Sequence, residues 1–227
     1  MPRGNADKGK CAYCGEALAK NAVTKHLAAC AKRKTIITAA EQKKGASETL
    51  YHLRAENPYL KQFWLDLEVR GSATLKDLDH YLREIWLECC GHMSQFSVGG
   101  WGGQEIAKTR RIDQVLKRDV ELTHIYDFGT ETETRIKVIG TRTGHPTTKH
   151  PVALMLRNLM PDTPCIDCGK AATHLCKECM IEEGVWGALC DEHAETHPHD
   201  EYGEPTPLAN SPRMGQCGYE GPAEPPY

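Results

Sequence analysis

The sequence contains no long apolar run and few aromatic side chains. No stretch approaches the roughly 20 consecutive apolar residues that a membrane-spanning helix requires, and the residues before Cys11 include no apolar signal region. Aromatic residues make up 7% of the 227 residues, whereas 40% of the chain is hydrophobic. We therefore expect a soluble, cytoplasmic protein that can bury a sizeable core.

Several catalytic signatures are also missing. Residues 99–103 read GGWGG, but no Lys-Ser/Thr pair follows them as in a phosphate-binding loop. The sequence has no nucleophile elbow, no protein-kinase motif set and no dinucleotide fingerprint. These absences disfavour the best-known enzyme classes, and we lean toward a protein without catalytic activity.

Charge is unevenly distributed along the chain. Residues 1–44 carry ten Lys/Arg and three Asp/Glu, a net charge of +7, whereas the remainder carries a net charge of −10. Residues 162–204 contain eleven acidic and two basic side chains. A basic segment attracts phosphate and an acidic one is repelled by it, although charged runs are often only solvated faces.

Cysteine and histidine near the N-terminus have the spacing of a zinc finger. Cys11 and Cys14 form a Cys-x2-Cys pair, and His26 and Cys30 form a His-x3-Cys pair. A tight turn can direct both sulfurs of the first pair at one ion, and residues four apart share a face of the helix that we expect over 23–32. The four residues therefore predict one closed Cys3His zinc site, since spaced cysteine pairs favour metal over disulfides in a reducing cytosol.

A second cluster of metal-binding side chains lies near the C-terminus and offers more donors than one ion can use. We assign Cys165, Cys168, Cys190 and His193 to one zinc ion, and Cys176, Cys179, His197 and His199 to another. His174 and Cys217 are alternative donors, and a single ion with spare histidines is the simpler alternative. The spacing of residues 165–199 resembles that of the B-box family of cross-braced zinc modules, a resemblance that implies protein contacts. With the finger, about three zinc ions per chain are expected.

The remaining chain divides by composition and periodicity. Residues 1–34 form the finger, 35–48 a linker, 49–158 a central domain, 162–200 the two-zinc module and 201–227 a Pro/Gly-rich tail. In the central domain we expect strands at 50–56, 63–69, 93–98, 122–128, 133–138 and 152–156, and the strand at 63–69 should be half-buried. We also expect a main helix at 74–88 and a short helix at 112–116. The expected fold is α+β, a small antiparallel sheet with one main packed helix flanked by two small zinc-binding modules.

Several central segments also carry a family resemblance. They read YHLRAENP, FWLDLEVRGSATLKDLDHYLREIWLECCGHMSQFSV and HIYDFGTETETRIKV, and the tail contains NSPRMGQCGYEG. Residues 49–158 and this tail resemble the Ri-plasmid open-reading-frame-three-like family, which also contains mobile-element passenger proteins. The resemblance implies a small α+β sandwich and no established activity. Thr130 and Thr132 depart from the family, whose members often carry an acidic and an aromatic residue there.

Some central residues allow a functional or a structural interpretation. His92, Asp127, Glu131 and Glu133 would form an enzymatic His/carboxylate site if they converged on one cleft. Alternatively, Asp127 caps a turn and the two glutamates face solvent. Adjacent Cys89 and Cys90 cannot comfortably face one ion, and we expect them to pack in the core.

Three functions are compatible with this pattern. We favour a zinc-binding adaptor in which the N-terminal finger, within residues 1–44, contacts nucleic acid and the acidic module of residues 162–200 contacts protein. The nucleic-acid contacts would come from Lys8, Lys10, Lys20, Lys25, Lys32, Arg33 and Lys34. The alternatives are a purely protein-binding zinc protein and, less favoured, an enzyme built on the central His/carboxylate set.

Overall fold

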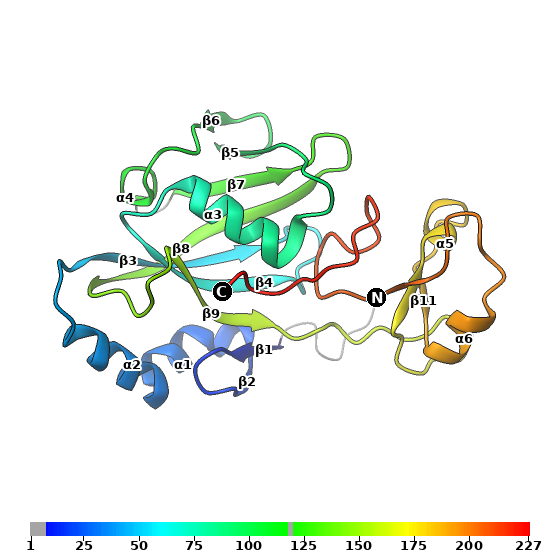
Figure 1. Ribbon diagram of the computed structural model, residues 1–227, viewed down its shortest axis with the longest axis horizontal. Helices are drawn as coiled ribbons and strands as arrows, with labels where there is room; N and C mark the ends of the chain where they lie inside the picture. The colour runs from blue at the N-terminus through cyan, green and yellow to red at the C-terminus, as the bar shows by residue number, and fades with distance from the viewer. Residues whose placement is uncertain (1–7, 118–119) are drawn as a thin grey trace.

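A computed structural model describes residues 8–117 and 120–227, so residues 1–7 of the predicted finger lie outside it. Nine strands of the described chain form one sheet in the order β2-β1-β9-β4-β3-β8-β7-β5-β6, and all neighbouring strands are antiparallel (Figure 1). The strands are β1 Lys8–Cys11, β2 Ala17–Ala19, β3 Glu48–Glu56, β4 Trp64–Arg70, β5 Ser94–Val98, β6 Gln104–Ile106, β7 Glu121–Tyr126, β8 Thr132–Gly144 and β9 Val152–Asn158. The α+β class predicted from the sequence is confirmed, with a larger sheet than expected.

One main helix packs on this sheet. α3, Leu75–Leu82, begins at a capping box in which Asp77 N–H donates to Thr74 Oγ1 over 3.3 Å and Thr74 N–H donates to the Asp77 carboxylate over 2.7 Å. It continues into a π-helical turn, η2, Arg83–Leu87. The apolar stripe is fully buried and consists of Leu75, Leu78, Leu82, Ile85 and Trp86. Each buried aliphatic side chain contributes about 1.5–3 kcal/mol to folding, which fixes the helix on the sheet. A second, short helix in this domain is α4, Ile112–Val115.

Strand β4 is buried on both faces, which corrects the prediction of a half-buried strand. Leu65, Leu67 and Val69 pack in the core beneath α3. On the other face, Trp64 packs with the N-terminal finger, and Asp66 is fully buried beside Arg54. The finger covers a sheet face that the alternating pattern alone assigns to solvent.

The N-terminal module is part of the main sheet. Its strand β1 pairs with β9, with Gly9 opposite Asn158. It also contains η1, Lys20–Ala22, and α1, Val23–Ala29, and its core is shared with the central domain through Trp64, Met155 and Leu156. The first half of the predicted linker at 35–48 is helical instead, since α2 spans Ala31–Glu41 and follows α1 after a break at Cys30.

The C-terminal module lies at one end of the molecule and has its own three-stranded sheet (Figure 1). Its elements are β10 His174–Cys176, α5 Lys177–Ile181, β11 Gly187–Leu189, α6 Asp191–Thr196 and β12 Thr206–Pro207. The residues after β12 return to the central domain, where Arg213 is fully buried. The predicted Pro/Gly-rich tail is therefore an integral packed segment.

Membrane insertion of a helix has no support in the described residues, because none of their helices combines the length and the apolar character that crossing a bilayer requires.

Candidate metal centres

The N-terminal finger brings its four predicted ligands together. The ligand atoms of Cys11, Cys14, His26 and Cys30 all lie within 4.8 Å of one another. After β1 the chain turns back at Gly15, whose N–H donates to the Cys11 carbonyl over 2.9 Å at a φ of 79° that favours glycine. α1 presents His26, and the chain leaves that helix at Cys30. The predicted turn and helix thus supply two ligands each.

The spacing of these atoms fits a bound ion. In a zinc tetrahedron with bonds of about 2.3 Å to sulfur and about 2.0 Å to nitrogen, ligand atoms lie about 3.3–3.8 Å apart. Cys14 Sγ lies 3.5 Å from His26 Nε2. The other ring nitrogen, His26 Nδ1, lies 3.5 Å from a Glu16 carboxylate oxygen. Such an outer carboxylate orients a metal-binding imidazole and increases its basicity.

In the C-terminal module, the first cluster joins Cys165, Cys168, Cys190 and His193. His193 Nδ1 lies 3.4 Å from the sulfurs of both Cys165 and Cys190, and the sulfurs of Cys168 and Cys190 are 3.7 Å apart. The Cys165 turn repeats that of the finger, with Gly169 N–H donating to the Cys165 carbonyl over 2.9 Å. These are the four residues that spacing assigned to one ion.

The second C-terminal cluster joins Cys176, Cys179, His197 and His199. Cys179 Sγ lies 3.2 Å from both His197 Nε2 and His199 Nδ1. Gly187 packs against this pair of cysteines, where an added Cβ would lie 2.6 Å from that of Cys179, so only glycine fits. The two clusters interleave along the chain, as predicted for a cross-braced module. His174 is outside both and contacts Thr173 and Asp191.

Local electrostatics prepare some thiols for metal binding. Burial opposes ionisation of Cys165, but the backbone N–H groups of Cys190, Cys168 and Asp167 outweigh it and lower the thiol pKa to about 6. Burial instead raises the pKa of Cys11 to about 11 and that of Cys179 to about 12. A divalent cation would offset that penalty, because a metal-bound thiol is deprotonated.

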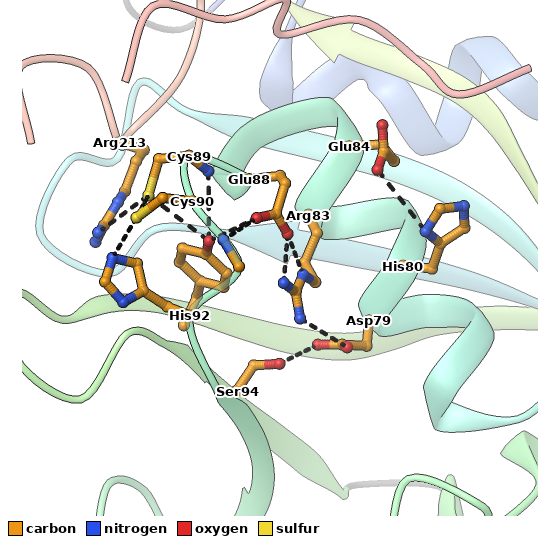
Figure 2. Close-up of polar contacts among 12 residues, drawn as sticks. Asp79, His80, Arg83, Glu84, Glu88, Cys89, Cys90, His92, Ser94 and Arg213 are labelled. Atoms are coloured by element: carbon orange, nitrogen blue, oxygen red, sulfur yellow. Dashed lines mark hydrogen bonds and ion pairs between the residues drawn. The ribbon is translucent and has the colours of Figure 1, made fainter. Parts of the chain in front are cut away.

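A fourth cluster, which sequence reasoning missed, joins Cys89, Cys90, His92 and Cys217. The prediction that adjacent Cys89 and Cys90 pack in the core is wrong for Cys90, which is exposed. The chain bends directly after η2, and the two sulfurs lie 3.8 Å apart on one side of the bend. Figure 2 shows both cysteines and His92 turned toward one another, with Arg213 beside them. The Cys-Cys-x-His spacing was the available signal, but Cys217 is 127 residues from Cys90.

The suggested enzymatic set does not assemble as a unit. His92 Nε2 does lie 3.4 Å from an Asp127 oxygen. Asp127 also accepts the Gly129 N–H over 2.9 Å, which confirms the turn-capping interpretation. Glu131 is exposed, but Glu133 is buried and is held by Arg135 at 3.0 Å and by the Tyr59 hydroxyl at 3.3 Å. The alternative that both glutamates face solvent is therefore wrong for Glu133.

A buried polar network beneath α3 was also missed. His124 is fully buried, and its Nε2 lies 2.7 Å from Asp79, which also accepts from the Ser94 hydroxyl at 2.6 Å and the Lys108 ammonium at 3.0 Å. These hydrogen bonds outweigh burial and hold the Asp79 pKa well below its usual range, whereas burial lowers the pKa of His124. No local pattern indicates this network, because His124 is 45 residues from Asp79.

The predicted nucleic-acid residues fall into two groups. Lys20 pairs with Glu56 at 2.6 Å, and Arg33 lies 3.6 Å from Glu68. The others are exposed and form no ion pair within the described residues; they are Lys8, Lys10, Lys25, Lys32 and Lys34. Two of the seven cations are therefore neutralised within the molecule.

An apolar cavity of about 540 Å³ lies where the C-terminal module meets the central domain. Its lining includes Phe63, Met160 and Met214 from the main body and Ile166 and Trp186 from the module. Trp186 is 42% exposed and Ile166 46% exposed. This junction therefore presents apolar surface to solvent.

Comparison with known proteins gives little further information. No protein-family model matches the chain, and no curated protein matches it. Among solved structures, the crystal structure of MM3350, a protein of unknown function from Methanosarcina mazei Go1, aligns with a TM-score of 0.40 and 15% sequence identity. The alignment covers 46% of this chain and 66% of that one, slightly less than two thirds of its length. We therefore base the functional proposal on the residues of the chain itself.

Proposed function

We propose that this protein is a zinc-binding adaptor without catalytic activity, which contacts nucleic acid through its N-terminal finger and protein through its C-terminal module. The observation that carries the proposal is the gathering of four donors in each of the three predicted clusters. Thiolate and imidazole are the donors that zinc prefers, and an ion with four protein ligands has no open position for a reacting water. Such ions stabilise small folds and leave their surfaces for binding.

The nucleic-acid part of the proposal rests on charge. Five exposed lysines of the N-terminal module remain without an intramolecular ion pair in the described chain, on β1, α1 and α2. Among them, Lys25 on α1 and Lys32 on α2 are both available to phosphate. Neutralising phosphates releases condensed counterions, which makes the binding salt-sensitive and independent of base sequence.

The protein-contact part rests on the C-terminal module. This acidic segment is repelled by phosphate but exposes Ile181, Val185 and Trp186, which are 58%, 45% and 42% exposed. Apolar residues surrounded by polar ones are characteristic of protein interaction sites. The resemblance to the B-box family supports the same role.

A purely protein-binding function is the second candidate. The ion pairs of Lys20 and Arg33 favour it, because they remove two cations from the proposed phosphate surface. In that case the apolar junction would be the main binding surface and the basic finger only a solvated face.

We also propose membership of the Ri-plasmid open-reading-frame-three-like family for residues 49–158. The quoted sequence segments support it, and the α+β class of the fold agrees with the small α+β sandwich that the resemblance implies.

A direct test compares nucleic-acid binding by the zinc-loaded full chain at two salt concentrations, with duplex and single-stranded probes. Lys25→Glu/Lys32→Glu should weaken binding to all sequences and reduce the salt slope by about 2, one unit for each phosphate that is no longer neutralised. The matched control, Lys76→Glu/Lys149→Glu, changes the charge equally at exposed positions of the central domain and should bind as the native chain does. Absence of binding at low salt would reject this part of the proposal and favour the protein-binding candidate.

A further inference from the structure

The fourth cluster joins two segments that are distant in the sequence. Cys89, Cys90 and His92 lie on the bend that follows η2, and Cys217 lies on the C-terminal segment that folds back from β12. The four ligand atoms all lie within 4.8 Å of one another. Three donors on one loop cannot close a tetrahedron, and Cys217 supplies the fourth.

The distances in this cluster match an ion site better than a disulfide. His92 Nε2 lies 3.1 Å from Cys90 Sγ and 3.2 Å from Cys217 Sγ, and these two sulfurs are 3.6 Å apart. A disulfide requires about 2.05 Å between sulfurs. A zinc tetrahedron has sulfur–sulfur edges of about 3.8 Å and sulfur–nitrogen edges of about 3.5 Å, from which these three distances differ by no more than about 0.4 Å. The imidazole nitrogen between the sulfurs is a further metal donor and has no part in a disulfide.

A buried cation lies beside the cluster. Three thiolates and one divalent ion carry a net charge of −1, and the guanidinium of Arg213, which is fully buried and also pairs with Asp127, lies 3.6 Å from Cys89 Sγ. The Tyr126 hydroxyl accepts the Cys89 N–H over 3.3 Å and so fixes the backbone of the bend. Outer partners of this kind orient ligands and tune the affinity of metal sites. Figure 2 shows Arg213 directed at Cys89.

We infer that Cys89, Cys90, His92 and Cys217 form a fourth zinc site, and that its ion fastens the C-terminal segment to the central domain. The ion closes a loop from residue 90 to residue 217, which includes the whole C-terminal module. Because closing a long loop restricts the unfolded chain, the ion stabilises the folded chain, and it directly holds the C-terminal segment against the central domain. This site does not depend on the proposed adaptor function.

Exposure distinguishes the fourth site from the others. Two of its ligands, Cys90 and Cys217, are exposed, whereas the other three sites together have one exposed ligand, Cys168. A chelator therefore reaches the fourth ion first. Partial chelation should remove one ion and loosen the C-terminal segment beyond Arg213, while the other three sites stay loaded and Arg213 keeps its contacts with Asp127.

The test is metal analysis of the purified full chain combined with Cys217→Ser. The native chain should hold four zinc ions, and Cys217→Ser should hold three while its circular dichroism remains native, because Arg213 still anchors the segment. Chymotrypsin should cleave the variant after Tyr219, which is 3% exposed in the folded chain, at least ten times faster than the native chain. Three ions in the native chain, or an unchanged count in the variant, would overturn the inference.

A second measurement needs no variant. Iodoacetamide should alkylate Cys90 and Cys217 slowly in the zinc-loaded native chain despite their exposure, and quickly after brief chelation, as read by mass spectrometry. Equal, rapid alkylation of both residues with zinc in excess would overturn the inference even if Cys217→Ser failed to fold.

Discussion

The Arg213 guanidinium is fully buried and pairs with the Asp127 carboxylate, 86 residues earlier in the chain. One terminal nitrogen, Nη2, contacts this carboxylate, and the other, Nη1, donates to the Thr132 hydroxyl over 3.1 Å and to the Thr130 carbonyl. The guanidinium also lies over the Tyr126 ring, 5.1 Å from its centroid. One side chain therefore connects the C-terminal segment with the β7–β8 turn and with the loop that carries the fourth cluster.

Replacing this arginine should destabilise the fold strongly. Arg213→Ala leaves the Asp127 carboxylate buried without its partner, and breaking a buried pair typically costs about 3–5 kcal/mol. Urea unfolding of the zinc-loaded chain measures this loss. The control is Arg111→Ala, which breaks the exposed pair with Asp113 and should change stability by less than about 1 kcal/mol. If the two substitutions lower the free energy of unfolding equally, the buried pair contributes no more to stability than the exposed pair does.

Docking of the finger on the central sheet depends on a close approach at Gly9. A Cβ added there would lie 2.4 Å from Leu156 Cδ2, 2.7 Å from the Arg157 carbonyl and 2.7 Å from the Trp64 ring. Gly9→Ala should therefore force β1 away from β9 and destabilise the protein by about 1–3 kcal/mol, as overpacking does.

The matched control for that substitution is Gly140→Ala on β8, where an added Cβ meets nothing within 4 Å. Thermal unfolding followed by tryptophan fluorescence suits the comparison, because Trp64 lies at the finger interface. A melting temperature lowered equally by the two substitutions would contradict the packing explanation.

How much the sequence predicted depends on the range of the interactions. Spacing predicted the three ligand groups that the structure brings together, because turns and helical faces are local. The periodicity of Leu75, Leu78 and Leu82 likewise predicted the main helix, and the sequence left its start open between Ser72 and Thr74, of which Thr74 is the N-cap. The helix and each short ligand pair depend on residues within one or two turns of each other, whereas the joining of pairs such as Cys165 and His193, 28 residues apart, was predicted from the interleaved pattern of cross-braced modules.

Features that depend on tertiary contacts were not predictable in the same way. Burial of both faces of β4 follows from the finger that packs on Trp64, and no local pattern records that contact. Cys217 reaches the fourth cluster on a returning segment that contacts the central domain through Ser211 and Arg213, far from Cys90 in the sequence. Residues 35–41 of α2 were assigned to a linker because the composition of 35–48 is polar and small, and this mostly exposed helix has no strong apolar stripe to reveal it.

The buried His124 should make stability dependent on pH. Burial, with Lys108 and Arg83 nearby, lowers its pKa against the opposing effect of Asp79. The unfolded chain therefore binds a proton below about pH 6.5 that the folded chain does not, so the stability due to neutral His124 is lost as pH falls. The Asp79 pKa is also lowered, so its contribution is present above about pH 4 and is lost below it.

The variant His124→Asn removes the first of these effects. The difference in unfolding free energy between the native chain and this variant should shrink by up to about 1.4 kcal/mol for each pH unit below about 6.5. Urea unfolding at pH 7.5, 6.5 and 5.5 with excess zinc measures it. His80→Asn is the control, since that side chain is 63% exposed, and its difference should stay constant. If the difference for His124→Asn does not change with pH, the pKa of His124 is the same in the folded and unfolded states, which contradicts the prediction.

Metal removal should unfold the C-terminal module and leave the central sheet folded. The core of that module consists of Leu189 and the ligand cysteines Cys165, Cys176, Cys179 and Cys190. Such a module has little apolar area of its own, and structural zinc contributes about 10–16 kcal/mol of apparent binding free energy at neutral pH. The central domain instead has a large apolar core under α3.

Hydrogen exchange of the full chain, before and after chelation, should show protection lost in β10 and β11 and kept in β3, β4 and β8. Returning zinc should restore it and magnesium should not, because magnesium prefers oxygen donors. Protection retained in β10 after metal analysis shows complete removal would contradict the metal-dependent folding of this module.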